Sequence, residues 1–386
     1  MFSSRFNYEL SDNLLNNLLK EKNSNSEKIL DLTISNPTLA GFDFNSSEIL
    51  SAISGAESIQ YNPNPRGLLT ARSAVSNYYK NAGYVIKPDS IFLTSGTSEA
   101  YSFLFKLLTN PGDEILIPQP SYPLIDFIAN LENINAVEYP LIYDGNWEIN
   151  INKIKERITE KTKAIIIINP NNPTGSYVKK QEIEKLNEIC SGKEIAIISD
   201  EVFLDYKIDK NVDVTSLAGN TKTLTFVLSG ISKICALPQL KLSWIQINTD
   251  KKLFSKVSER LEIITDTYLS VGTPVQLAAE YLIKNRLYIQ KQIIKRINKN
   301  LELIAKKVVN SEKILLYKPE GGWYVILKFS SKMNDEERCL KLLKEFNVYI
   351  HPGYFFDFTE DGYVVLSLIT PEEDYQKGIE IILNNY

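Results

Sequence analysis

One segment of the sequence combines hydroxyl groups and a glycine in the way that a phosphate-binding turn requires. TSGTSEA, residues 94–100, places Ser95, Gly96 and Thr97 between an apolar run and an expected helix. Free N–H groups at the start of a helix, beside a glycine that permits close approach, favour a bound phosphate. Ser or Thr in this position is more often a simple N-cap, so the motif alone is a weak signal.

Two further turns carry an amide and a carboxylate that could bind a ligand. NPNNPTG, residues 169–175, follows an apolar run and is typical of a turn that ends a strand. Asn172 on this turn is placed to donate a hydrogen bond to a cofactor oxygen. SDEVF, residues 199–203, puts Asp200 at the end of another apolar run. A buried carboxylate must be paired or hydrogen-bonded, so Asp200 is either a helix cap or the partner of a cationic ring nitrogen.

A fourth motif, SGISK at residues 229–233, again follows an apolar run and ends in Lys233. Taken alone, Lys233 is typical of a surface lysine. Ligand sites of open α/β sheets gather at the carboxyl ends of strands. Because all four motifs follow strand-like runs, we expect them to contribute to one site.

The elements that must position these motifs are short β-rich runs that alternate with helical stretches. The runs are 91–94, 114–118, 164–169, 195–200, 224–229 and 244–247. This alternation predicts an α/β fold with a doubly wound, mixed but mostly parallel sheet. Residues 281–310 have helical periodicity and predict one long amphipathic helix. A strand within GGWYVILKF, a helix at 335–346 and a strand at 363–369 then predict a small α+β domain.

Composition narrows the class of protein. A net charge of -4, from 43 basic and 47 acidic residues, leaves no basic field for nucleic acid. Cys190, Cys235 and Cys339 lie far apart and indicate buried thiols in a reducing compartment. No stretch approaches the roughly 18 apolar residues of a membrane span, and no signal peptide is evident, so we expect a cytoplasmic protein. His351 is the one histidine; it is typical of a structural residue, and we expect no metal site.

With the four motifs in this order, the chain resembles the class I/II aminotransferases of fold type I, the pyridoxal phosphate enzymes related to aspartate aminotransferase. The likeness extends to YNPNPRG (61–67), PSYP (120–123), LPQLKLSW (237–244) and the C-terminal EGGWYVIL and HPGYFF segments. It implies pyridoxal 5'-phosphate as cofactor. It also implies a large domain over residues 46–280, a small domain formed by 1–45 and 281–386, and a homodimer with a shared active site.

The resemblance assigns roles to residues around the cofactor ring. Lys233 forms the Schiff base and then moves a proton between the substrate and cofactor carbons. Asp200 pairs with the pyridinium nitrogen, and Asn172 binds the phenolic oxygen. The resemblance implies a catalytic role for Tyr122 as well as for Lys233 and Asp200. Tyr122 stacks on one face of the cofactor ring, and Val202 packs against the other.

The resemblance also implies which residues bind the phosphate and the substrate. The phosphate ligands are Ser95, Gly96, Thr97, Ser232 and Lys241, together with Tyr61 from the neighbouring subunit. Asn36 and Arg66 border the substrate.

Three departures from the family pattern touch the cofactor. Phe203 stands where a tyrosine usually contacts the phenolic oxygen, so we expect Asn172 to make that contact alone. Lys241 stands where an arginine is usual, and a lysine is a point donor rather than a bidentate fork. Gly230 replaces a serine, so one phosphate hydroxyl is lost unless Ser229 or Ser232 substitutes.

A fourth departure touches the substrate. Val365 stands in the C-terminal strand where the family usually has an arginine that binds the substrate's α-carboxylate, and neither Val364 nor Leu366 is basic. A valine cannot bind a carboxylate. The sequence therefore leaves two possibilities: another cation such as Arg66 or Lys328, or a substrate that is held differently.

The leading interpretation is an aminotransferase that uses an amino acid or related amine and a 2-oxo acid or aldehyde. The alternative is a pyridoxal phosphate lyase of the C–S β-elimination type on the same scaffold, which the missing arginine favours. A ligand-sensing regulator is disfavoured because too few residues precede position 31 for a DNA-binding domain. An inactive relative is disfavoured because Lys233, Asp200 and Asn172 are all present.

Overall fold

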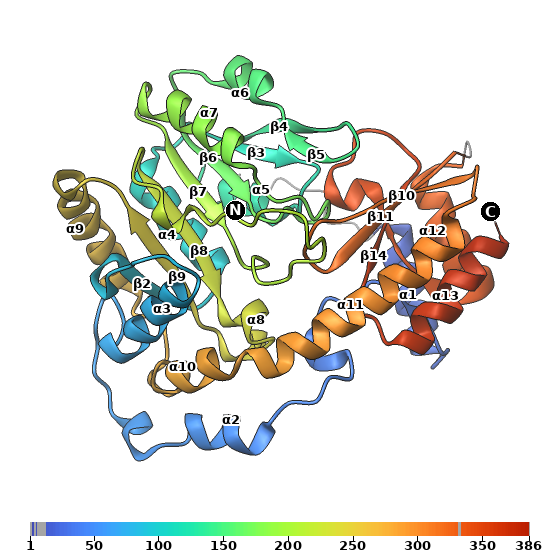
Figure 1. Cartoon of the computed structure of the whole chain (residues 1–386), viewed down its shortest axis with the longest axis horizontal. Coiled ribbons are helices and arrows are strands. Elements are labelled where there is room, and N and C mark those ends of the chain that lie inside the picture. Colours follow the sequence, from blue (N-terminus) through green and yellow to red (C-terminus); the bar gives the residue numbers. More distant parts are fainter. Residues whose placement is uncertain (1, 4, 6–12, 331–332, 386) are drawn as a thin grey trace.

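The computed structural model describes residues 2–3, 5, 13–330 and 333–385. It contains an eight-stranded sheet, a four-stranded sheet and a two-stranded pair. Figure 1 shows the large sheet on the left and the small sheet, with its helices, on the right. The predicted α/β class is confirmed by this arrangement.

The large sheet runs in the order β2-β9-β8-β7-β6-β3-β4-β5. Its strands are β2 (Ile91–Thr94), β3 (Glu114–Gln119), β4 (Asn135–Tyr143), β5 (Trp147–Ile149), β6 (Thr162–Ile168), β7 (Ala196–Asp200), β8 (Thr225–Gly230) and β9 (Ser243–Asn248). Neighbouring strands from β8 to β4 pair in parallel, whereas β9 and β5 are antiparallel to their neighbours. All six predicted runs lie on strands of this sheet, and β4 and β5 are strands that the sequence analysis did not predict.

Both faces of the large sheet are covered by helices, and alternate residues of each strand point to opposite faces. In β6, Ile166 packs into one apolar cluster and Ile165 into the other. One face is covered by α4 (Thr97–Leu108), α5 (Leu124–Leu131) and α9 (Lys251–Tyr268). The other face is covered by α3 (Leu69–Asn81), α6 (Ile151–Arg157), α7 (Lys180–Ser191), α8 (Ile231–Ile234) and α10 (Thr273–Asn285).

The C-terminal part forms an antiparallel sheet in the order β10-β11-β14-β13. The remaining strands and α-helices are α1 (Leu14–Ser24), β1 (Leu30–Asp31), α2 (Ser46–Ile53), α11 (Leu287–Val308), β10 (Ile314–Tyr317), β11 (Tyr324–Phe329), α12 (Asp335–Phe346), β12 (Val348–Tyr349), β13 (His351–Pro352), β14 (Tyr363–Ser367) and α13 (Glu372–Asn384). Strand β1 pairs in parallel with β12, which joins the N-terminal segment to the C-terminal part.

The long amphipathic helix predicted over 281–310 is confirmed as α11, but its predicted start is wrong. Helix α10 ends at Asn285, and α11 begins at Leu287, with Arg286 between them. The Arg286 Nε approaches Asp205 Oδ2 at 3.4 Å, and its guanidinium lies 4.9 Å from the centre of the Tyr78 ring. The break therefore falls where a tertiary ion pair holds the chain. The proposed division between two domains stays a prediction, and residues 1, 4 and 6–12 of its first segment lie outside the described residues.

Candidate active site

The four predicted motifs meet at one edge of the large sheet. Strands β6, β7 and β8 are parallel, and both β2 and β8 are antiparallel to β9, so the carboxyl ends of β2, β6, β7 and β8 share an edge. The start of β9 closes this edge, since Ser243 pairs with both Thr94 and Gly230. The sheet topology thus brings together residues that lie far apart in the sequence; Thr94 and Lys233 are 139 positions apart.

Lys233 lies on the short helix α8, directly after β8. Tyr206 Oη donates a hydrogen bond of 2.6 Å to the Lys233 carbonyl and fixes the backbone there. The Lys233 Nζ lies 4.9 Å from the centre of the Trp323 ring and 5.3 Å from that of Phe203. Burial lowers the pKa of this amine to about 8, although the charge of Asp200 opposes the shift. A pKa closer to neutrality than that of an exposed lysine suits a nucleophile and a proton acceptor.

Gly230 is required by close packing against β9. A Cβ on Gly230 would lie 2.1 Å from Ser243 Oγ and 3.0 Å from the Leu242 carbonyl oxygen. The Ser243 hydroxyl therefore occupies the space that a side chain at position 230 would take. The sequence analysis considered Ser229 and Ser232 as substitutes and did not identify Ser243.

Asp200 ends β7 and is buried. Tyr101 Oη donates to its Oδ2 at 3.0 Å, and the Val202 N–H donates to its Oδ1 at 3.2 Å. Burial raises the pKa of Asp200 to about 6, against the opposing effects of these two hydrogen bonds and of Lys233. The carboxylate is thus held in place but short of positive charge, which suits a cationic ligand. Tyr101 comes from α4 and was missed by the sequence analysis.

The start of α4 offers backbone N–H groups at the same edge. Gly96 is its N-cap residue and provides no side-chain cap. The Ser95 N–H is already used, because it donates to Glu99 Oε2 at 2.8 Å, and Ser270 Oγ donates to the same oxygen at 2.6 Å. The Lys241 Nζ lies 3.7 Å from the position of a Cβ on Gly96. An amine beside a helix N-terminus is a favourable setting for an anion.

Four buried polar atoms on the turns near this edge and on Trp323 find no hydrogen-bond partner among the described residues. They are Ser121 Oγ, Asn171 Nδ2, Asn172 Oδ1 and Trp323 Nε1. Buried polar groups in proteins are usually paired. Of these groups, the Trp323 ring lies next to the Lys233 Nζ, so at least one unpaired polar group is close to the candidate site, where a polar ligand could pair with it.

Other predicted site residues are partly or largely exposed. Tyr122 follows β3 with 49% of its surface exposed, and Tyr61 is 77% exposed. Val202 is partly buried against the core. Thr97 begins α4, and Ser232 lies one residue before Lys233. Roles for these residues in cofactor binding stay predictions.

The two substrate-binding candidates are already engaged with other groups. Asn36 Oδ1 accepts from the N–H of Thr38 at 3.1 Å. The Arg66 guanidinium donates to Glu262 Oε2 at 3.0 Å and to the Asp89 carbonyl at 3.0 Å. A carboxylate bound by Arg66 would therefore share the guanidinium with Glu262 and the Asp89 carbonyl.

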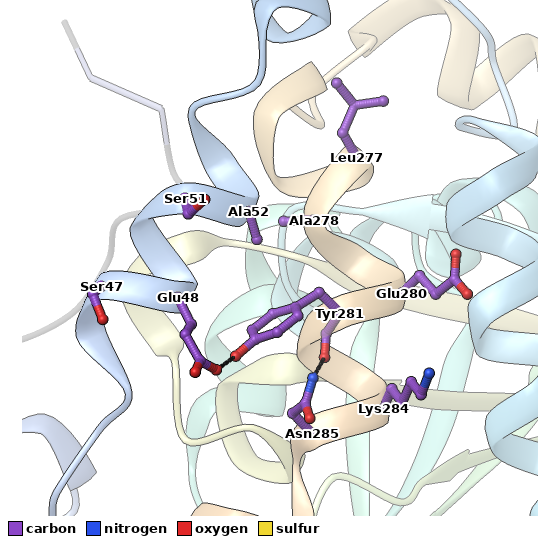
Figure 2. A pocket seen from close by; sticks show the side chains of 10 residues that line it. All are labelled: Ser47, Glu48, Ser51, Ala52, Leu277, Ala278, Glu280, Tyr281, Lys284 and Asn285. Atoms are coloured by element: carbon purple, nitrogen blue, oxygen red, sulfur yellow. Dashed lines mark hydrogen bonds between the residues drawn. The ribbon is translucent and has the colours of Figure 1, made fainter.

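A surface pocket between α2 and α10 lies apart from these residues (Figure 2). Tyr281 donates a hydrogen bond to Glu48 across it, and Asn285 Nδ2 donates to the Tyr281 carbonyl at 2.9 Å. None of the strand-end motifs contributes to its lining. We therefore place the candidate site at the sheet edge rather than in this pocket. Among the described residues, no group of three or more His, Cys, Asp or Glu could hold a metal ion, and no helix is long and apolar enough to cross a membrane.

Glu201, next to Asp200, provides a stability test of this buried region. It is 1% exposed, and burial raises its pKa to about 7 from 4.5. It accepts from the Leu217 N–H at 2.8 Å, from Ser199 Oγ at 3.0 Å and from Ser216 Oγ. The folded protein holds this proton more tightly than the unfolded chain, so stability falls as pH rises from 4.5 to 7.

Glu201→Gln should therefore increase the free energy of unfolding above pH 7 by about 3 kcal/mol, with little change near pH 4.5. The amide oxygen can keep the bonds from Leu217 and Ser199, and the amide N–H can donate to the Ser216 hydroxyl. Urea unfolding at both pH values measures the effect, with the exposed Glu184→Gln as control. Equal destabilisation at both pH values would contradict this account.

Comparison with known proteins adds an independent finding. Residues 27–382 match the family described as aminotransferase class I and II. The chain is 29% identical to a glutamate-pyruvate aminotransferase of Haemophilus influenzae, over 88% of this chain and 86% of that protein. An alanine aminotransferase structure from Pyrococcus furiosus superposes with a TM-score of 0.91 at 28% identity, covering 100% of this chain and 99% of that one. An S-alkyl-thiohydroximate lyase of Arabidopsis thaliana is 28% identical, over 74% of this chain and 64% of that protein.

Proposed function

The chain belongs to the class I and II aminotransferases, and we propose that it moves an amino group from an amino acid or related amine to a 2-oxo acid or aldehyde, using pyridoxal phosphate bound at the carboxyl edge of the large sheet. The observation that carries the proposal is that a partly buried amine, Lys233, and a buried carboxylate, Asp200, follow the neighbouring strands β8 and β7 at this edge. The named relatives that are aminotransferases support it.

The residues at the edge fit this cofactor. Bound pyridoxal phosphate supplies a positively charged pyridine ring that draws electrons from the carbon bearing the amine. Asp200 has the charge to pair with the ring N–H, and the amide N–H of Asn172 is proposed to donate to the phenolic oxygen of the ring. The uncapped start of α4, Lys241 and Ser232 are suited to the phosphate.

The chain's own groups then account for the proton transfers. Lys233 provides the amine that would attach the cofactor, and once free it can take a proton from the substrate carbon and deliver it to the cofactor carbon, two bonds away across the nitrogen. Its pKa of about 8 places that exchange near neutral pH. Tyr122 and Val202 are proposed to hold the ring from its two faces.

A homodimer and a cytosolic location belong to the same proposal. Tyr61 is exposed, so its hydroxyl is available to the site of the partner subunit. The three cysteines are free and buried, which supports a reducing compartment.

The proposal is tested by recording the absorbance of the protein with pyridoxal phosphate and then adding amines without an acceptor. Conversion of the cofactor to its amino form supports transamination and identifies the donor. Release of ammonia or thiol without that conversion would instead support the lyase alternative. No change in cofactor absorbance on binding would remove the cofactor assignment.

Tyr101 gives a prediction that separates positioning from packing. Tyr101→Phe removes the 3.0 Å hydrogen bond to Asp200, which further raises the pKa of that carboxyl and weakens its pairing with the ring nitrogen. A hydrogen bond to a charged group contributes about 1.5–3 kcal/mol, so we expect at least about tenfold weaker cofactor binding. Because the pKa of Asp200 is about 6, the loss should grow as pH falls toward 6.

Fluorescence titration of the apoprotein with pyridoxal phosphate measures this effect. Tyr139→Phe is the matched control, because Tyr139 is also buried but donates to the Ile166 carbonyl at 2.7 Å. Equal affinities of the two variants at every pH would show that Tyr101 does not act through Asp200.

A further inference from the structure

Helix α8, which carries Lys233, is a single turn, and the sequence after it leaves its end short of backbone donors. In a longer helix, the Ile234 carbonyl would accept from the N–H of residue 238, but that residue is Pro238, which has no N–H. Ala236 has a φ of 55°, in the left-handed region, so the helix ends there. The N–H of Ala236 returns to the Lys233 carbonyl at 3.1 Å. The last carbonyl of α8 therefore needs a donor from a more distant part of the chain.

Gln290 provides this donor. Its Nε2 donates to the Ile234 carbonyl at 2.8 Å and to Asp205 Oδ2 at 2.7 Å. Both partners are acceptors, so both hydrogens of the amide nitrogen are used and the orientation of the amide is fixed. Gln290 is 3% exposed, and a buried carbonyl that loses its donor destabilises the conformation that leaves it unpaired. Gln290 thus holds the end of α8 from outside that helix.

The preceding carbonyl of α8 is held from the same direction. Tyr206 Oη donates to the Lys233 carbonyl at 2.6 Å, and Tyr206 directly follows Asp205 in the sequence. Asp205 is itself fixed, because Arg286 Nε approaches its Oδ2 at 3.4 Å at the break between α10 and α11. Two consecutive carbonyls, those of Lys233 and Ile234, are therefore held by side chains that meet at Asp205.

Gln290 lies near the start of α11, the long helix that leads to the small sheet. Figure 1 shows α11 running from beside α8 toward that sheet, and the chain continues from α11 into β10. Further along the same helix, Asn300 Nδ2 donates to the carbonyls of Leu368 and Thr370 at 2.9 Å and 2.8 Å, just after β14. One buried amide of α11 thus holds the end of α8, and another holds the chain that leaves the small sheet. Helix α11 therefore connects the small sheet to the backbone that carries Lys233.

From these contacts we propose that Gln290 is a positioning residue for Lys233, which fixes the last carbonyl of α8 and so ties the place of the reactive amine to α11. This inference rests on the proposed function, in which Lys233 is the attachment point of the cofactor. Gln290 acts through the backbone of α8 rather than on the reacting atoms. Without its amide, the Ile234 carbonyl loses its donor in a buried setting, and the turn that carries Lys233 is free to shift.

Amide hydrogen exchange of the apoprotein tests this inference without the cofactor. Gln290→Met keeps the length of the side chain and removes both donated bonds. We expect the amides of Cys235 and Ala236, which bond back into α8, to exchange at least about fivefold faster than in the wild type. Asn300→Leu is the matched control, because it also removes two bonds that a buried amide of α11 donates to carbonyls. It should leave these two amides unchanged, and equal acceleration in both variants would overturn the inference.

Chemical labelling of the Lys233 amine gives a readout that a purely structural role would not change. Isotopic acetylation of the apoprotein over a range of pH, followed by peptide mass analysis, gives a titration midpoint for Lys233, with the exposed Lys222 as internal reference. Burial lowers the pKa of Lys233 to about 8, so an amine displaced toward water should titrate at higher pH. We expect the neutral fraction of Lys233 at pH 7 to fall at least about threefold in Gln290→Met and to stay unchanged in Asn300→Leu. An unchanged midpoint in Gln290→Met, or the same change in both variants, counts against the positioning role.

Gln290→Glu keeps the test decisive if the methionine variant does not fold. A carboxyl group has at most one donor hydrogen, which the Asp205 carboxylate attracts more strongly than the Ile234 carbonyl does, so the bond to α8 is lost while the shape is kept. Exchange and labelling should therefore change in the same direction as in Gln290→Met. Pyridoxal phosphate added to either variant should attach at least about threefold more slowly than to the wild type, as followed by cofactor absorbance. Failure of the wild type to attach the cofactor at Lys233 would overturn the proposed function, whereas the two measurements on the apoprotein would still decide whether Gln290 holds α8.

Discussion

The Lys233→Ala protein is expected to lose covalent attachment of pyridoxal phosphate and at least about 10⁴-fold of its transamination rate. Lys233 provides both the attaching amine and the proton acceptor, and its pKa of about 8 reflects a partly buried position that another lysine cannot reproduce. Lys241, the other amine at this edge, lies beside Gly96 rather than near Asp200. Borohydride reduction followed by peptide mass analysis locates the attached cofactor, and a stopped-flow half-reaction gives the rate.

The control is Lys222→Ala, which removes an exposed lysine from the turn before β8. It should bind cofactor and turn over like the wild type. Because the alanine variant keeps Asp200 and the phosphate-binding groups, small primary amines added to the buffer should restore part of the rate by acting as an external base. Reduction that links the cofactor to Lys241 or to any other lysine in the wild type would contradict this assignment.

The position of the site could be predicted from sequence because it follows from strand direction. Parallel strands place their carboxyl ends at one edge, so the motifs that end β6, β7 and β8 could be expected there, whereas β2 reaches this edge through its antiparallel pairing with β9. Local pattern also located α12 and the core of β14. These features depend on the residues within each element, which the sequence displays directly.

Other features depend on packing between distant segments, and the sequence could not display them. Tyr101 hydrogen-bonds Asp200 because α4 lies against β7 and β8, a relation between residues 99 positions apart. The Arg66 ion pair with Glu262 joins residues 196 positions apart, so the sequence could not show that this candidate carboxylate ligand already has an anionic partner. Ser243 fills the space above Gly230 only because β9 pairs with β8 in one particular register.

Asp200→Asn is expected to have the second-largest effect, a loss of about 10²–10³-fold in both cofactor affinity and half-reaction rate. Removing one partner of a buried charged pair costs about 3–5 kcal/mol, because the other charge is left without compensation. Asparagine keeps the shape: its amide oxygen can accept from the Val202 N–H, and its amide N–H can donate to the Tyr101 hydroxyl, so the fold should persist. The substitution also removes the charge that opposes the lowering of the Lys233 pKa, so that pKa should fall further below about 8.

A rescue experiment distinguishes loss of charge on the ring from general damage to the site. In Asp200→Ala, the smaller side chain leaves room for a methyl group on the ring nitrogen, and an N-methylated cofactor analogue keeps its positive charge without a carboxylate partner. This analogue should recover a large part of the half-reaction rate in the alanine variant and none in Lys233→Ala, because a charged ring still needs an amine to move the proton. An equally poor rate with either cofactor in Asp200→Ala would show that Asp200 acts by positioning rather than by charge.

The pH dependence of cofactor binding tests the role of the Asp200 charge in a second way. The affinity of the wild type for the cofactor should weaken as pH falls through about 6, where Asp200 gains its proton, and the Asp200→Asn variant should show no such change.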